Sequence, residues 1–301
     1  MTVPIPSEEK LSKQELLEDS KPENILRSVI RQLLSDNVSR IGGIIILFLV
    51  VIAIFANYIA PYNPYYQDLA HRLTPPSVNH LLGQDQLGRD VLSRIIYGTR
   101  ISLEVGITVM VISLSIGTIV GAIAGYYGGK IDQIIMRIAD VFLAFPGLIL
   151  AIGLMAVLGQ GIVNVIVSLS IVAWPGYARV IRSQALSLKE LEYVEAARLM
   201  NASSPRLIFR HIIPNSISPI IILGTIGIGF AILAEAGLSF LGLGVGPNIP
   251  SWGSIIADGR ANFILDPYLM IFPGIFLALA VLGFNLIGDS LRDALDPSLR
   301  F

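Results

Sequence analysis

Few residues of this chain have types and spacings that could do chemistry. Its 301 residues include no cysteine and only three histidines, all outside the long apolar runs. Gly-Leu-Ser-Phe at 237–240 superficially resembles a serine nucleophile, but no histidine within an apolar run could act as its base, and no His-Glu-x-x-His zinc motif occurs. The sequence therefore argues against an intramembrane hydrolase, and we expect His71, His80 and His211 to be surface or structural residues.

Glu235 is the one carboxylate deep within an apolar run. It recurs at four-residue spacing with Gly227, Ala231 and Ser239, so it lies on one helical stripe that faces other helices or a cavity rather than lipid. It could line a substrate pathway, act as the coupling acid of an ion-driven transporter, or form a hydrogen bond inside the bundle. Because intramembrane acids usually pair within their bundle, we interpret Glu235 first as a helix-packing residue.

Nucleotide binding and nucleic-acid binding are not predicted. The formal net charge is −1, and no Gly-x-x-x-x-Gly-Lys-Ser/Thr loop is present. The stretch at 126–132 contains Gly-Gly-Lys but has neither the spacing nor the hydroxyl residue of that loop. We therefore expect no ATP hydrolysis, no cofactor and no metal in this chain, so any energy from ATP must come from a separate subunit.

The elements that must position these residues are predicted to be membrane-spanning helices. Hydrophobic residues make up 53% of the chain and charged residues 14%, whereas a soluble domain carries about 25% charged residues. Apolar runs recur at about the 20 residues that a helix needs to cross a bilayer. The predicted fold is an all-α membrane protein with six transmembrane helices, near residues 41–60, 101–126, 134–158, 162–177, 218–241 and 268–288.

Basic residues predict the orientation of these spans. The segment 179–215, between the fourth and fifth spans, is rich in arginine and lysine, as is the approach to the first span. The first loop is an exception, in which three arginines are offset by three aspartates: Arg72, Arg89, Arg94, Asp68, Asp85 and Asp90. We expect both termini and segment 179–215 in the cytosol of a multi-pass protein of the cell membrane, with loops 61–98 and 242–267 outside.

Local patterns predict how the spans pack. A stripe of small residues at four-residue spacing lets the backbone of the second span approach another helix closely: Ser113, Gly117, Gly121 and Gly125. Three prolines predict kinks within or near the ends of later spans: Pro146, Pro175 and Pro273. The mixed sequence 248–263 predicts a short outer helix or re-entrant element, in which Trp252 could be an interfacial anchor.

Segment 179–215 predicts a compact helix–corner–helix unit. Ser187 and Glu190 form a capping-box pattern, so we expect a helix from about Leu188 to Met200. Asn201 then stands where a helix commonly ends in a left-handed residue.

A second helix is expected to follow the corner. Ser204 could cap it, with Pro205 at its first position, and it is expected to continue to Pro214 with Arg206 and Arg210 on one face. The unit could also be a solvated amphipathic hairpin on the membrane surface.

Residues 195–215 of this unit resemble the glutamate-alanine-alanine loop of ABC importer permeases. Glu195, Ala196 and Ala197 match the start of that motif, and Ile212 and Pro214 match its end. The sequence departs from the motif at residue 201, where the family usually has glycine and this chain has asparagine.

Four further stretches resemble C-type subunits of dipeptide/oligopeptide permeases. They are residues 80–103, 136–152, 234–245 and 250–260, so the resemblance runs from the first span to the C-terminus. It implies a cytosolic tail over 1–39, a first helix with an external loop over 40–100, and a five-helix importer core over 101–301.

The resemblance also implies partners and site residues. The first helix of segment 179–215 would dock on a cytosolic ATPase subunit and couple its ATP- and Mg-dependent closure to transport. The implied coupling residues are Tyr193, Glu195, Ala196, Ala197, Arg198, Asn201, Arg206 and Arg210. The implied partners are a related B-type permease, two ATPase subunits and an extracytoplasmic substrate-binding protein. Dipeptides, oligopeptides, nickel chelates and oligosaccharides stay open as substrates, and an ion-coupled secondary transporter that uses Glu235 is the alternative function.

Overall fold

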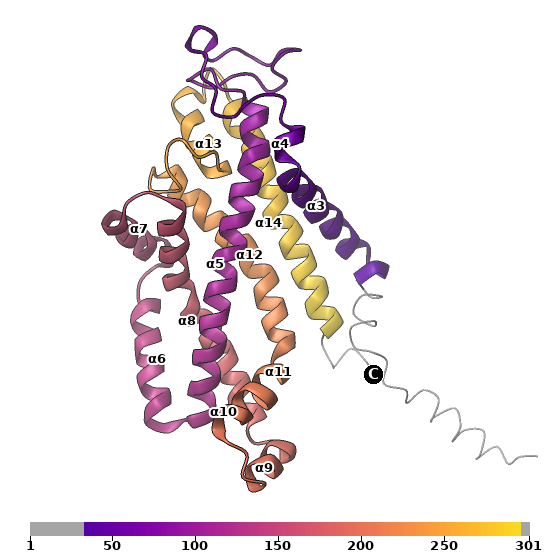
Figure 1. The fold of residues 1–301 in the computed structure, drawn as a ribbon, viewed down its shortest axis with the longest axis vertical. Coiled ribbons are helices and arrows are strands. Elements are labelled where there is room, and N and C mark those ends of the chain that lie inside the picture. Colours follow the sequence, from indigo (N-terminus) through magenta and orange to yellow (C-terminus); the bar gives the residue numbers. More distant parts are fainter. Residues whose placement is uncertain (1–32, 296–301) are drawn as a thin grey trace, which may run out of the picture.

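The computed structural model describes residues 33–295 and is helical over most of that range (Figure 1). No β-strand occurs within 33–295, where Gln84 and Asp90 form one isolated antiparallel bridge. The all-α fold class predicted from the sequence is confirmed. The predicted tail over 1–39 lies mostly outside the described residues.

Five of the described helices are long and apolar enough to cross a membrane. Their bounds are α3 Asn37–Ile54, α5 Val91–Tyr127, α8 Ile162–Leu188, α12 Ile217–Phe240 and α14 Tyr268–Leu295. They match five of the six predicted spans. Helix α5 begins well before its predicted span, and α8 continues well beyond its own. Helices α8 and α14 both continue past an internal proline, Pro175 and Pro273 respectively.

The remaining predicted span is a sharply bent pair of helices. Helix α6 covers Gly129–Leu143 and α7 covers Gly147–Leu158, and the pair is bent by 85°. The bend falls at Pro146, because proline has no backbone N–H to donate and disfavours the α conformation of the residue before it. The predicted kink is confirmed, and the pair makes a sixth crossing if its two helices count as one span.

Helices α5 and α8 pack along much of their length. A Cβ atom added to Gly117 of α5 would lie 2.6 Å from the Cβ of Tyr177, and one added to Gly125 would lie 2.6 Å from the carbonyl oxygen of Arg182. Real Cβ atoms do not approach this closely, so the backbones could not lie so near with larger residues. The close approach predicted for this stripe is confirmed.

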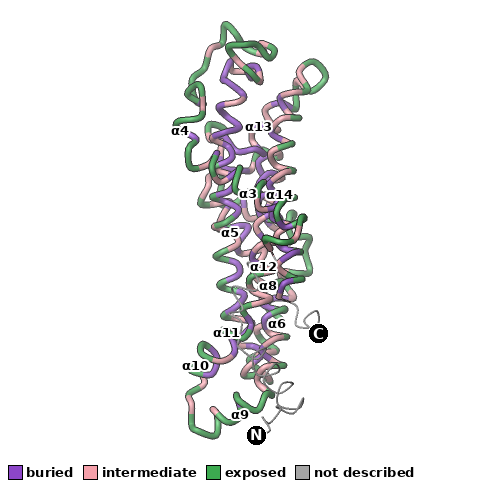
Figure 2. The backbone as a smooth tube through the Cα atoms, turned by 90° about the vertical axis from the view of Figure 1, so that its right-hand side faces the viewer, coloured by how far each residue is buried: buried purple, intermediate pink, exposed green. Residues whose placement is uncertain are grey.

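The elongated bundle carries different structures at its two ends (Figures 1 and 2). One end carries the loop 61–90 and the short helix α13, Trp252–Gly259, and is called here the α13 end. The opposite end carries α9, Glu192–Leu199, and is called the α9 end. Shorter elements connect the helices at these ends: α4 Ala56–Ile59, 3-10 turns at Leu69–His71 and Arg260–Asn262, and three short segments after α9.

The core near α13 is built around a tryptophan. Trp252 is fully buried and packs in one apolar cluster with Leu49 of α3, Ile95 of α5, Ile232 of α12 and Phe284 of α14. The predicted short helix in 248–263 is confirmed as α13. The suggested role of Trp252 as an interfacial anchor is wrong, because its side chain holds α13 against four other helices.

Candidate functional site

Segment 179–215 begins as a continuation of α8. The sequence predicts a helix from Leu188 with Ser187 and Glu190 as its capping box, but α8 ends at Leu188 and α9 begins only at Glu192. The Ser187 hydroxyl donates to a carbonyl one turn earlier in α8 (3.4 Å). The predicted capping box is therefore wrong.

Packing against α5 explains why α8 continues through this signal. Ala185 is fully buried, and its Cβ would lie 2.6 Å from a Cβ added to Gly125 of α5. Lys189, at the C-cap of α8, donates from Nζ to the Gly125 carbonyl oxygen (3.0 Å). These tertiary contacts outweigh a capping preference that is worth roughly 1 kcal/mol.

The corner after α9 has the conformation that the sequence predicts. Asn201 has a φ of +64°, in the left-handed region. Its N–H donates to the Arg198 carbonyl (2.9 Å), and the Ala202 N–H donates to the Ala197 carbonyl (3.1 Å). These two bonds are those of a Schellman motif, in which a left-handed residue ends the helix and satisfies its last carbonyls. The left-handed corner at Asn201 is confirmed.

Glycine and β-branched residues at position 201 should differ in their effect on the stability of this corner. Asn201→Gly is expected to be tolerated, because glycine enters the left-handed region without steric cost. Asn201→Val is expected to destabilise the corner by about 1–2 kcal/mol and to lower the amount of transport complex recovered from membranes. The measurement is recovery of the complex and transport by both variants. Equal recovery and transport with valine and glycine would contradict this account of the corner.

The second half of the unit is less regular than predicted. Ser203, not Ser204, is the N-cap of α10, Ser204–Leu207, so the predicted cap is wrong by one residue. A π-helical turn over Ile208–Ile212 and α11, Ile213–Asn215, follow in place of one continuous helix.

Pro214 explains why the hydrogen bonding changes here from the α to the π pattern, because proline has no N–H to donate to the carbonyl four residues earlier. The Ile213 N–H instead bonds to the Ile208 carbonyl, five residues back. Arg206 lies in α10 and Arg210 lies inside the π-helical turn, and both are exposed.

The residues of α9 divide into one buried anchor and an exposed surface. Val194 is fully buried. Five predicted coupling residues in and next to this helix are exposed, and Ala197 is half-buried; the exposed ones are Tyr193, Glu195, Ala196, Arg198 and Asn201. Glu195 lies in the first turn of α9, where a carboxylate interacts favourably with the helix dipole. The structure therefore brings these residues together on one protruding element.

Contacts fasten this element to the α9 end of α5. The Arg198 guanidinium lies 5.9 Å from the ring centre of Tyr126, and the Tyr126 hydroxyl donates to Ser204 Oγ (3.5 Å). Arg182 of α8 binds both carboxylate oxygens of Asp132 in α6, with 2.5 Å between Nη2 and Oδ2. Segment 179–215 is thus tied to the ends of both α5 and α6.

Glu235 lies away from this unit, in α12. It is fully buried, and the Ser239 hydroxyl donates to its Oε1 (2.6 Å). The Ser251 hydroxyl in turn lies 3.5 Å from the Ser239 hydroxyl, which links this pair to the start of α13. Glu235 does not line the apolar hollow of about 390 Å³ that lies between α5, α7, α8 and α12.

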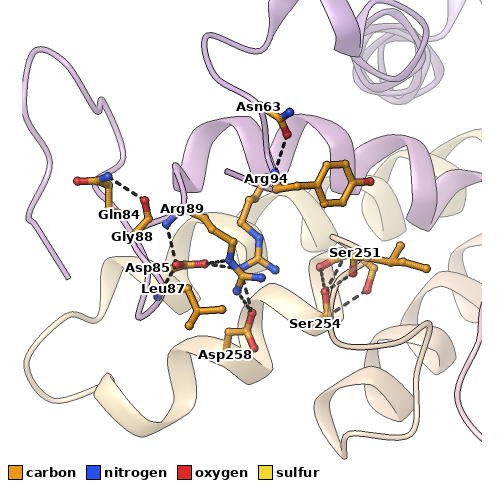
Figure 3. A network of polar contacts seen from close by, with 12 residues as sticks. Asn63, Gln84, Asp85, Leu87, Gly88, Arg89, Arg94, Ser251, Ser254 and Asp258 are labelled. Carbon is orange, nitrogen blue, oxygen red and sulfur yellow. Dashed lines mark hydrogen bonds and ion pairs between the residues drawn. The ribbon is translucent and has the colours of Figure 1, made fainter. Parts of the chain in front are cut away.

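A cluster of four charged side chains, three buried and one partly exposed, lies at the α13 end (Figure 3). Asp85 Oδ2 accepts from Arg89 Nε (2.7 Å) and from Arg94 Nη1, while Asp258 Oδ2 accepts from Arg89 Nη2 and Arg94 Nη1 (both 2.9 Å). We call Asp85, Arg89, Arg94 and Asp258 the clasp. Burial alone would raise the pKa of the Asp85 carboxyl, but the guanidiniums of Arg94 and Arg89 hold that pKa below its usual value.

The clasp is only partly predictable from the sequence. Arg89, Arg94 and Asp85 stand out as opposite charges near the start of an apolar run, and from the sequence they are expected only to offset each other in the first external loop. In the structure these side chains are at most 4% exposed, and both arginines also contact Asp258 from a distant part of the chain. Within 33–295 no cluster of His, Cys, Asp or Glu could hold a metal ion. Nδ1 of His80 lies 2.9 Å from Oδ1 of Asp90, the N-cap residue of α5.

The helices and the protruding unit define a multi-pass membrane protein with a helical projection at one end. Residues 117–301 match the family described as "Binding-protein-dependent transport system inner membrane component", and residues 24–76 match the "N-terminal TM domain of oligopeptide transport permease C". The chain belongs to this family of inner-membrane transport components. It is therefore a permease subunit and not an enzyme, and the predicted relationship with C-type peptide permeases is confirmed.

Two curated relatives align over nearly the whole chain. The glutathione transport system permease protein GsiD of Pectobacterium atrosepticum is 46% identical over 91% of this chain and 91% of its own length. The dipeptide transport system permease protein DppC of Alkalihalophilus pseudofirmus is 43% identical over 91% of this chain and 90% of its own length. A solved structure of the MetNI methionine ABC transporter in inward-facing conformations aligns with 65% of this chain and 95% of that chain, at 19% identity and a TM-score of 0.49.

Proposed function

We propose that this chain is one of two permease subunits of an ATP-driven importer of short peptides, and that its α9 docks on a cytosolic ATPase subunit. The observation that carries the proposal is the exposed α9 with its Schellman corner, in a chain of this permease family. A short helix that ends in a fixed corner can transmit a displacement, whereas a flexible loop would absorb it. The ATP and Mg²⁺ belong to the ATPase subunits.

The surface of α9 has a chemistry that suits docking. Ala196 and Ala197 present a low-relief face that a partner can approach closely, and Glu195 offers an exposed carboxylate to a basic partner residue. Arg206 and Arg210 add exposed positive charge on the segment that returns to the membrane. The contacts to Tyr126 and Gly125 support this role over that of a loose hairpin on the membrane surface, because they fix the unit to α5.

The remaining partners follow from the family. We infer a related B-type permease beside this chain and a second ATPase subunit bound to the cytosolic side of that permease. We also infer an extracytoplasmic binding protein at the α13 end. The names of two relatives favour glutathione-sized peptides as substrates over nickel chelates or oligosaccharides. The test is ATP hydrolysis by the reconstituted complex with its binding protein. Stimulation by a dipeptide or tripeptide supports the proposal, and stimulation only by a nickel chelate or an oligosaccharide contradicts it.

The proposed orientation places the α9 end in the cytosol and the α13 end outside. Because the chain has no native cysteine, single cysteines can report this directly. Ser203→Cys, next to α9, is expected to be protected from a membrane-impermeant thiol reagent in intact cells, and Asn248→Cys, before α13, is expected to react. Both positions are exposed, so access and not burial decides the outcome. The reverse pattern would overturn the orientation and the docking role together.

A further inference from the structure

The clasp joins three parts of the chain at the α13 end (Figure 3). Asp85 and Arg89 belong to the loop 61–90, Arg94 lies in the first turn of α5, and Asp258 lies near the end of α13. Two positive and two negative groups balance each other, and each aspartate contacts both arginines. The loop and α13 are therefore fastened to each other and to the start of α5.

A second contact fixes the other end of α13. The backbone N–H of Trp252 donates to Ser102 Oγ of α5 (3.2 Å), and the Ser251 hydroxyl caps α13 by accepting from the backbone N–H of Ser254 (3.2 Å). With Trp252 fully buried, α13 is held along α5 at both its first turn and its last. Loop 61–90, α13 and the start of α5 thus form one body, which we call the platform.

Helix α5 runs without interruption from the platform to the α9 end. Its 37 residues contain no proline and form a helix about 55 Å long at about 1.5 Å per residue. At its far end, the Gly125 carbonyl accepts from Lys189, and Tyr126 contacts Arg198 and Ser204. The same helix therefore contacts the clasp at one end and the proposed docking segment at the other.

Helix α8 stiffens this connection. The small-residue stripe brings the backbones of α5 and α8 too close for any added Cβ at Gly117 or Gly125. Since α8 also continues directly toward α9, a displacement of the docking segment reaches α5 through both main-chain packing and the Lys189 and Arg198 contacts.

We propose that α5 is a rigid strut that carries movement between the α9 docking segment and the platform, and that the clasp is the joint that makes the platform follow the strut. This inference rests on the proposed function, since it requires an ATPase at the α9 end and a binding protein at the α13 end. Coupling between two sites is reciprocal, so a broken clasp should weaken signals in both directions.

The test uses the complete complex with its ATPase subunits and binding protein in proteoliposomes. Asp258→Ala removes the link from α13 and leaves one aspartate for two buried arginines. The double variant Arg89→Met/Asp258→Ala restores charge balance but still lacks the link, so it separates the joint from a role in charge balance alone. Arg72→Met is the matched control, because Arg72 is an exposed arginine of the same loop outside the clasp.

Two quantities are measured for each variant. The first is the stimulation of ATP hydrolysis by loaded binding protein, which should fall about fivefold or more in the single and double clasp variants and not in Arg72→Met. The second is the effect of ATP on thiol labelling of Ala261→Cys, an exposed position in the turn directly after α13, which should be present in the parent and lost in the clasp variants.

The outcomes separate the strut from the proposed function. If no ATPase subunit copurifies with the parent chain, the proposed function fails. If the parent complex assembles but the labelling of Ala261→Cys never responds to ATP, the strut is wrong. Full stimulation in the charge-balanced double variant would likewise overturn the inference, because the clasp would then contribute only charge balance. Low stimulation in the double variant at normal assembly supports it.

Discussion

Glu195→Arg is expected to remove most of the ATPase subunit from the purified complex without lowering the amount of this chain in the membrane. Glu195 is exposed in the first turn of α9, and no membrane-spanning helix depends on it. In the proposed complex its carboxylate meets a basic residue in the ATPase. Arginine would place two positive charges together, and breaking a partly buried pair from one side costs about 2–5 kcal/mol. The measurement pairs membrane abundance with recovered ATPase.

Glu190→Arg is the matched control for this prediction. It makes the same change of charge in the turn between α8 and α9, outside the Glu-Ala-Ala motif, and Glu190 is also exposed. Because the structure places no helix start at Leu188, this substitution removes no cap and should retain the ATPase. The docking assignment fails if Glu195→Arg keeps full ATPase recovery and transport while Glu190→Arg loses both.

Glu235→Leu is expected to lower the amount of folded chain in the membrane sharply, whereas Glu235→Gln should have little effect on abundance or transport. The buried Ser239 hydroxyl donates to the Glu235 carboxyl, and leucine removes the acceptor. A buried polar group left without a partner costs about 1–3 kcal/mol. Glutamine keeps the size and an acceptor oxygen. The measurement is membrane abundance by immunoblot and transport by the complex at equal abundance.

A double substitution sharpens the result for Glu235. Combining Glu235→Leu with Ser239→Ala removes donor and acceptor together, so it should recover part of the abundance that Glu235→Leu loses. If Glu235→Gln instead assembles normally but abolishes uptake, and uptake by the parent depends on protons or sodium without any ATPase, Glu235 is a coupling acid. That result would favour the secondary transporter over the proposed importer.

Local chemistry made several features predictable from the sequence. The stripe of Gly117, Gly121 and Gly125 predicts close helix packing, and Pro146 predicts the bend between α6 and α7. Proline alone does not decide this, because α8 and α14 continue past Pro175 and Pro273. Asn201 is one of the few residue types that tolerate the left-handed corner. Each of these features depends on a residue and its immediate neighbours, so no knowledge of the tertiary fold is needed.

Other features depend on contacts that spacing does not reveal. The capping box predicted at Ser187 does not form, because Ala185 of α8 packs against Gly125 of α5 and α8 continues through this position. The sequence shows Arg89 and Arg94 only as charges in a loop. Their contacts with Asp258 depend on where the fold places α13. The π-helical turn follows from Pro214 together with the need to enter α12, a combination that no single residue signals.

The π-helical turn at Ile208–Ile212 also affects how α10 and α12 are rotated relative to each other about their axes. An α-helix rotates by about 100° with each residue, so a change of one residue between α10 and α12 would turn every side chain of α12 about its axis. A π-helical turn holds one more residue than an α-turn, so it can take up the loss of one residue locally by converting to α geometry. Segment 204–215 can therefore be shortened by one residue while α12 keeps the same face toward α5 and α14.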